Sequence, residues 1–87
     1  MIDLYRIIEV LPKSGILRSV HREVLGTKCY PAFLEVGERG FIKFFDPIDY
    51  DWHRLHTSTI EKVTYEDDMI TIVTRNTKYV LKKELEA

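Results

Sequence analysis

The chain has 87 residues, which suffice for one modest core and are too few for a second, so we expect a single domain over residues 1–87. Its content of 45% hydrophobic and 11% aromatic residues excludes intrinsic disorder. The formal net charge of −1 excludes an overall electrostatic field that would attract nucleic acid or anionic lipid.

The cysteine content and the N-terminal sequence indicate the compartment. Cys29 is the one cysteine of the chain, which excludes an internal disulfide framework and a multi-cysteine zinc site. The opening "MIDLYRIIEV" has no basic leader before an apolar run, and no apolar run approaches the ~20 residues that span a bilayer. We therefore expect a soluble, cytoplasmic protein with no membrane partner.

The N-terminal quarter has patterns of both helix and strand. Two sets of apolar residues follow helical spacing: Leu4, Ile7, Ile8 and Leu11, and then Ile16, Leu17, Val20 and Val24. Two strands around the turn "PKSG" are the alternative. Because the segment from Ile16 continues without a break into a clear strand, we predict a strand over 16–25 and a short helix over 3–10.

Five strands are predicted in the rest of the chain, where runs rich in β-branched and aromatic residues alternate with the turn sequences "GERG", "EDD" and "RNT". These strands cover residues 28–36, 41–45, 54–64, 69–75 and 78–83. Pro31 indicates an edge or a bulge in the first of them. Ile60 and Val63 can share a face only across a bulge near Glu61 and Lys62.

These signals predict a mainly β fold. We expect five to six antiparallel strands in a bent sheet or an SH3-like small barrel, with at most one or two short helices near the N-terminus. The predicted core consists of the apolar residues on the clearest strands: Phe33, Val36, Ile42, Phe44, Ile60, Val63, Ile70, Ile72 and Val80. Cys29 is predicted to be a further small core residue. Residues 46–53 are expected to form an exposed connection, with Trp52 partly buried where it meets the next strand.

Three short sequences, "GERGF", "WHRLHTSTIEKV" and "TRNTKY", together carry a resemblance to a known group of proteins. The segment from 26 to 81 that contains them resembles small, uncharacterised β-rich proteins encoded by bacterial phages and other mobile elements. That family has no established active site, so the resemblance implies a genomic setting and no specific activity. The outline of the strands is similar to SH3-like barrels, which host unrelated functions.

The segment 46–56 is rich in residues that carry chemistry. Asp49, Asp51 and His53 alternate, so in an extended segment they would project to one side as ligands for zinc or manganese. The sequence "DPIDYD" is equally typical of a solvated loop, and no further ligand obviously completes a coordination sphere. His53 and His56 would lie on opposite faces of a strand. Since catalytic motifs are also lacking, we predict no metal, no cofactor and no catalytic residue.

Three functions remain as hypotheses. The first is a non-catalytic protein–protein interaction module or small regulator, which binds another protein or a second copy of itself. The second is a nucleic-acid-binding small barrel, which the net charge and the aspartates at 46, 49 and 51 disfavour. The third is a small enzyme or metal protein centred on residues 46–56. The residues predicted to bind a partner are Arg39, Phe41, Tyr50, Trp52, His53 and Arg54.

Overall fold

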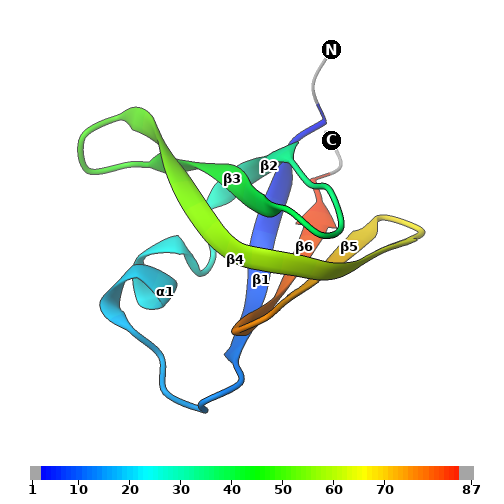
Figure 1. The fold of residues 1–87 in the computed structure, drawn as a ribbon. Helices are drawn as coiled ribbons and strands as arrows, with labels where there is room; N and C mark the ends of the chain where they lie inside the picture. The colour runs from blue at the N-terminus through cyan, green and yellow to red at the C-terminus, as the bar shows by residue number, and fades with distance from the viewer. Residues whose placement is uncertain (1–2, 85–87) are drawn as a thin grey trace.

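Six antiparallel strands close into a barrel in the computed structural model of the chain, which describes residues 3–84 (Figure 1). The strands are β1 (Tyr5–Pro12), β2 (Lys28–Phe33), β3 (Arg39–Asp46), β4 (Asp51–Glu66), β5 (Met69–Thr74) and β6 (Thr77–Lys83). Neighbours in sequence are neighbours in the sheet, and β1 also pairs with β6, which closes the barrel. One short helix, α1 (Ser19–Val24), lies between β1 and β2. The predicted fold class, mainly β with antiparallel strands in a small barrel, is confirmed.

Both predictions for the N-terminal quarter are wrong. Residues 3–10, predicted as a helix, contain most of β1, and residues 16–25, predicted as a strand, contain α1. Ile7 and Val10 are both buried although they are three residues apart, because the register of β1 against β6 shifts between Ile7 and Glu9. This bulge gives the strand the apolar spacing that is typical of a helix.

Helix α1 ends at Val24, two residues before Gly26. Gly26 has a φ of +83°, a left-handed conformation that favours glycine after the end of a helix. The Gly26 N–H donates a hydrogen bond to the carbonyl of Ile7 at 2.7 Å, which attaches the end of the helix to β1. The helix buries His21 and Val24, three residues apart, against the barrel. No helix within residues 3–84 is long and apolar enough to cross a membrane.

The five strands predicted in the rest of the chain are present as β2 to β6, with ends shifted by a few residues. β4 begins at Asp51, so the connection predicted for 46–53 is shorter than expected. The register of β4 against β5 shifts between Ile60 and Lys62, which confirms the predicted bulge. A register shift directly after Pro31 confirms the irregularity that this proline indicates in β2.

The barrel interior is filled by side chains from all six strands and from α1. The buried core consists of Ile7, Val10, Val24, Cys29, Ile42, Phe44, Leu55, Ile60, Ile70, Ile72, Tyr79 and Leu81. Val80 is also buried and Val63 packs against this core, so most of the predicted core is confirmed. Phe33 and Val36 are exposed, contrary to the prediction, because β2 ends at Phe33 and its bulge breaks the alternation of faces.

At Gly40, strand β3 passes close to both of its neighbours. A Cβ atom at this position would overlap the carbonyl oxygen of Phe33 and would lie 2.6 Å from Cδ1 of Ile60. The Gly40 N–H donates a hydrogen bond to Oγ1 of the buried Thr57 at 3.0 Å. Glycine is therefore required here by the close approach of two strands.

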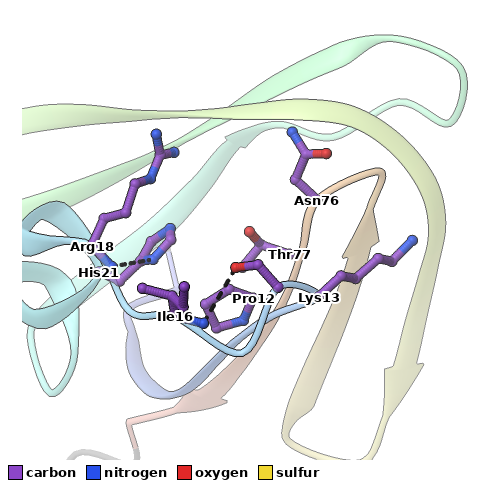
Figure 2. Close-up of a pocket in the computed structure, with 8 residues that line it drawn as sticks. Pro12, Lys13, Ile16, Arg18, His21, Asn76 and Thr77 are labelled. Atoms are coloured by element: carbon purple, nitrogen blue, oxygen red, sulfur yellow. Dashed lines mark hydrogen bonds between the residues drawn. The ribbon is translucent and has the colours of Figure 1, made fainter.

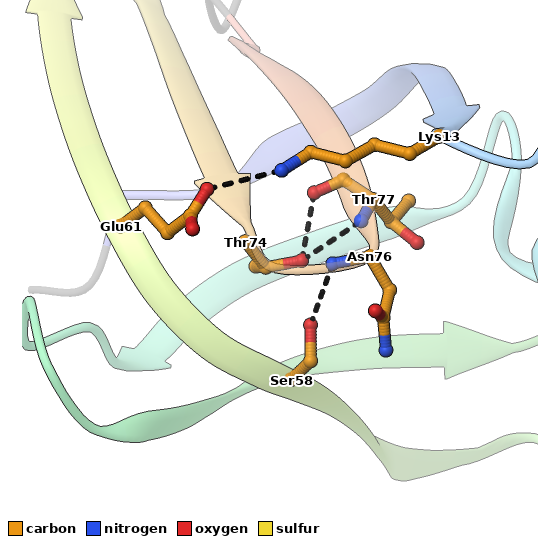
Figure 3. A network of polar contacts seen from close by, with 6 residues as sticks. All are labelled: Lys13, Ser58, Glu61, Thr74, Asn76 and Thr77. Carbon is orange, nitrogen blue, oxygen red and sulfur yellow. Dashed lines mark hydrogen bonds and ion pairs between the residues drawn. The ribbon is translucent and has the colours of Figure 1, made fainter.

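One side-chain hydrogen bond attaches the turn between β5 and β6 to β4, and two others lie within the turn (Figure 3). Oγ1 of the buried Thr74 donates to the carbonyl of Thr77 at 2.7 Å and accepts from the Thr77 N–H at 3.0 Å. The Asn76 N–H donates to Oγ of Ser58 at 3.1 Å. These bonds satisfy polar groups at the end of the barrel and fix the position of the turn.

Truncation of the fully buried Ile72 to alanine is expected to lower the free energy of unfolding by about 2–5 kcal/mol, since it leaves a cavity in the core. The exposed Val36 provides the matched control, and Val36→Ala is expected to change the same quantity by less than about 0.5 kcal/mol. Chemical denaturation of the three proteins measures both values. Equal effects of the two substitutions would show that the burial of Ile72 and the exposure of Val36 are assigned wrongly.

Gly40→Ala is expected to lower the free energy of unfolding by at least about 1–3 kcal/mol, because the backbone of Phe33 cannot move away from the new methyl group. The substitution is made in the wild-type protein and in Ile60→Val, which lacks Cδ1 and so relieves only the side-chain contact. We expect a similar loss in both backgrounds. Full recovery in Ile60→Val would contradict the assignment of the constraint to the backbone.

Candidate functional site

The outer face of β2, β3 and β4 carries aromatic and basic side chains. Because alternate residues of a strand point to opposite faces, and Ile42 and Phe44 lie in the core, the residues next to them in β3 face outward. The cross-strand pairs on this outer face are Phe41 with His56, Lys43 with Arg54, and Phe45 with Trp52. Tyr30 of β2 lies opposite Lys43.

Four aromatic side chains are in contact, each with the next, at the hairpin of β3 and β4 and on the neighbouring β2. We call these residues, Tyr30, Phe45, Tyr50 and Trp52, the aromatic cluster. The ring centroid of Phe45 lies 5.2 Å from that of Tyr50 and 5.5 Å from that of Trp52, and the Trp52 ring lies 5.3 Å from Tyr30. These distances are typical of attractive aromatic pairs. Trp52 is 37% exposed, in agreement with its predicted partial burial.

The tip of this hairpin presents apolar surface to solvent. Ile48 is 94% exposed and Tyr50 is 82% exposed. Tyr50 has a φ of 58°, in the left-handed region that residues other than glycine seldom adopt. Figure 1 shows the hairpin of β3 and β4 extending away from the rest of the barrel. We call Ile48 together with the aromatic cluster the hairpin patch.

His53 lies on the other face of the hairpin, where it interacts with the aspartates near the tip. It pairs with Phe44, and its Nε2 lies 2.6 Å from Oδ2 of Asp49 and 3.9 Å from Oδ2 of Asp46. The hydrogen bond with Asp49, together with the charges of the neighbouring aspartates, raises the pKa of His53 above its ordinary value of 6.5. A protonated His53 neutralises part of the negative charge of the tip.

Asp46, Asp49 and His53 bring three possible metal-ligand atoms within 4.8 Å of one another. The sequence places Asp51 in this group, but its carboxylate accepts the Trp52 N–H at 2.8 Å. The contacts of this group in the structure are those of an ion pair between His53 and Asp49 with Asp46 nearby, and exposed acidic groups are common without a metal ion.

The residues predicted to bind a partner do not form one group. Those on the outer face at or near the hairpin are Phe41, Tyr50, Trp52 and Arg54. Among these, the guanidinium carbon of Arg54 lies 5.0 Å from the centre of the Phe41 ring. His53 points the other way, as adjacent residues of a strand do. Arg39 begins β3, at the end of the strand remote from the tip. The opposite placement of His53 and His56 is confirmed, since His53 lies beside Phe44 and His56 beside Phe41.

Three members of the hairpin patch were not predicted as binding residues: Ile48, Phe45 and Tyr30. Phe45 has the same parity as Phe41 and Lys43 in β3, so continuing the alternation along "FIKFF" indicates that it faces outward. Tyr30 comes from a different strand, and its contact with Trp52 depends on the register of β2 against β3. No signal in the sequence gives that register.

Cys29 is a core residue, as predicted. Its side chain is fully buried, and this burial raises the pKa of the thiol to about 12. The thiolate is the nucleophilic form of cysteine, so Cys29 is not suited to nucleophilic chemistry.

Comparison of the chain with protein-family models, with curated proteins and with solved structures gave no match. The resemblance to proteins of phages and mobile elements therefore stays a prediction.

Asp49→Asn is expected to lower the pKa of His53 toward its ordinary value, because the substitution removes the carboxylate that accepts its hydrogen bond. In the wild-type protein the raised pKa means that the ion pair stabilises the fold below about pH 6.5, and that this contribution is lost as the pH rises through the raised pKa. NMR titration of the His53 ring measures the pKa, and thermal unfolding over the same pH range measures the stability difference.

The control for this titration is Asp68→Asn, which changes a carboxylate in the connection between β4 and β5. It is expected to leave the His53 titration unaltered. If Asp49→Asn also left the titration unaltered, the close contact between Asp49 and His53 would not exist in solution.

Proposed function

We propose that the protein is a non-catalytic protein-recognition module, a small cytoplasmic regulator, and that it binds its partner through the hairpin patch. The observation that carries this proposal is the exposure of Ile48 and Tyr50 beside Trp52 on a projecting hairpin. Exposed apolar surface of this kind on a small protein usually marks an interaction site. Trp and Tyr are also the side chains most enriched at the energetic centres of protein interfaces.

The charges around the hairpin patch define the chemistry of the partner. Asp46, Asp49 and Asp51 lie close to Ile48 and Tyr50 in the chain, so the tip of the hairpin is acidic, although Asp46 and Asp49 pair with His53 on the face opposite the aromatic cluster. A complementary partner has an apolar recess for Ile48 and Tyr50, bordered by lysine or arginine side chains. The contact is then weakened by salt, because the rim charges are exposed.

Single-stranded nucleic acid is the second candidate partner, and one observation favours it. Lys43 and Arg54 lie opposite each other on the outer face, next to Phe41 and the aromatic cluster, and alternating basic and aromatic side chains bind phosphates and stack on bases. The acidic rim of the hairpin and the net charge of −1 oppose a polyanion, so this candidate ranks below a protein partner.

The proposal is tested by affinity capture with three versions of the protein: the wild type, Ile48→Ala combined with Tyr50→Ala, and Tyr65→Ala. Tyr65 is an exposed aromatic residue near the other end of β4 and therefore a matched control. We expect a protein that is retained by the wild type and by Tyr65→Ala. With the purified partner, the double variant is expected to bind at least about tenfold more weakly.

Equal retention by all three versions would contradict the proposal. Fluorescence anisotropy with single-stranded DNA and RNA at low salt tests the second candidate. If the wild-type protein binds single-stranded DNA or RNA, and the variant with Lys43→Gln and Arg54→Gln does not, the nucleic-acid hypothesis takes the place of the protein-partner hypothesis. Sedimentation of the wild-type protein and the hairpin variant shows whether the partner is a second copy of the chain.

A further inference from the structure

A pocket of about 430 Å³ lies between the connection from β1 to α1 and the turn between β5 and β6 (Figure 2). Its lining residues are Pro12, Lys13, Ser14, Ile16, Arg18, His21, Asn76 and Thr77. None of them belongs to the hairpin patch. The volume falls within the range of small-molecule sites in proteins.

The lining of this pocket is cationic. Lys13 and Arg18 contribute positive charges, and no carboxylate is among the described residues that line it. Nζ of Lys13 is paired with Glu61 at 3.0 Å (Figure 3). Arg18 forms no ion pair within residues 3–84, so its charge is not neutralised by a neighbouring carboxylate. An anion in the pocket would supply the missing counter-charge.

His21 adds a hydrogen-bond donor to the pocket. The side chain is only 3% exposed, and its Nδ1 accepts the Arg18 N–H at 3.2 Å. Burial, together with the charge of Arg18, lowers the pKa of His21, so the imidazole is neutral at pH 7. Because Nδ1 acts as an acceptor, the proton of the neutral ring resides on Nε2, which is then a donor.

The polar and apolar groups of the pocket are arranged for a ligand with two parts. In Figure 2, Arg18 and Asn76 extend on two sides of the pocket, and His21, Thr77 and Pro12 lie between them. Arg18, His21 and Asn76 offer N–H donors to an oxyanion. Pro12 and the exposed Ile16 offer apolar surface beside these donors.

We propose that this pocket binds a small organic anion, in which a carboxylate or phosphate group is attached to a flat apolar body. The oxyanion accepts hydrogen bonds from Arg18 and from Nε2 of His21, with Asn76 as a further donor. The apolar body covers Ile16 and Pro12. The site is independent of the proposed partner binding, so either can fail without the other.

The test is an NMR titration of the full-length, isotope-labelled protein with phenyl phosphate, benzoate, inorganic phosphate and phenol. We expect saturable shifts of the Arg18, His21 and Asn76 resonances with phenyl phosphate or benzoate, with a dissociation constant in about the millimolar range. Inorganic phosphate is expected to bind more weakly because it lacks the apolar body. Phenol is expected to cause no saturable shift, because it lacks the charge.

Three variants locate the site. Arg18→Gln is expected to weaken the binding of phenyl phosphate at least about tenfold, since it removes a charged hydrogen-bond donor. Arg22→Gln removes an exposed arginine of α1, a residue that does not line the pocket, and it is expected to leave the affinity unchanged. Asn76→Asp places a carboxylate at the pocket and is expected to abolish binding, which provides a second test if Arg18→Gln does not fold.

The outcomes separate the possibilities clearly. Saturable binding that both pocket substitutions weaken, and that Arg22→Gln preserves, supports the proposal. Three results overturn it: no saturable shift with either organic anion, equal binding of phenyl phosphate by wild type and pocket variants, or binding of phenol as strong as that of phenyl phosphate.

Discussion

The antiparallel pairing of β1 with β6 determines which faces of the strands are buried. It joins the two ends of the sheet, so every strand gains an inner face toward one shared core. The pairing of β1 with β2 is much shorter than that of β1 with β6. Helix α1 lies between β1 and β2 in the chain, and its buried Val24 joins the core. The interior is filled mainly by aliphatic side chains, together with Phe44 and Tyr79, whereas Tyr30, Phe45 and Trp52 remain on the outside, where they are available for recognition.

The bulges explain both the success and the failure of fold prediction. Strands β2 to β6 were predictable because each lies between strong turn sequences, and the bulge after Ile60 showed itself as a break in an otherwise clear alternation. In β1 the same kind of bulge, after Ile7, produced a pattern that fits a helix. Only the pairing with β6, more than sixty residues away, selects the strand, and local sequence carries no record of that pairing.

The sequence predicts which segment contains the candidate site, but it does not predict which of its side chains share one face of the hairpin. Tyr50, Trp52 and Arg54 were identified because aromatic and basic residues are concentrated around them. His53 was grouped with them by its position in the sequence, although it faces the aspartates on the other side of the hairpin. The cationic pocket could not have been predicted, because barrel closure brings Arg18 and His21 to the turn at Asn76 from a distant part of the chain.

The burial of Cys29 has a consequence for the chemistry of the whole molecule. A thiol with a pKa of about 12, enclosed between β1 and β3, has almost no reactive thiolate and no path to oxidants or alkylating agents in the closed barrel. Its modification must wait until these strands separate. The rate at which a thiol reagent labels the chain therefore measures how often the barrel opens, in the same way that hydrogen exchange reports the opening of a buried amide. The single thiol is therefore an internal probe of the opening of this fold.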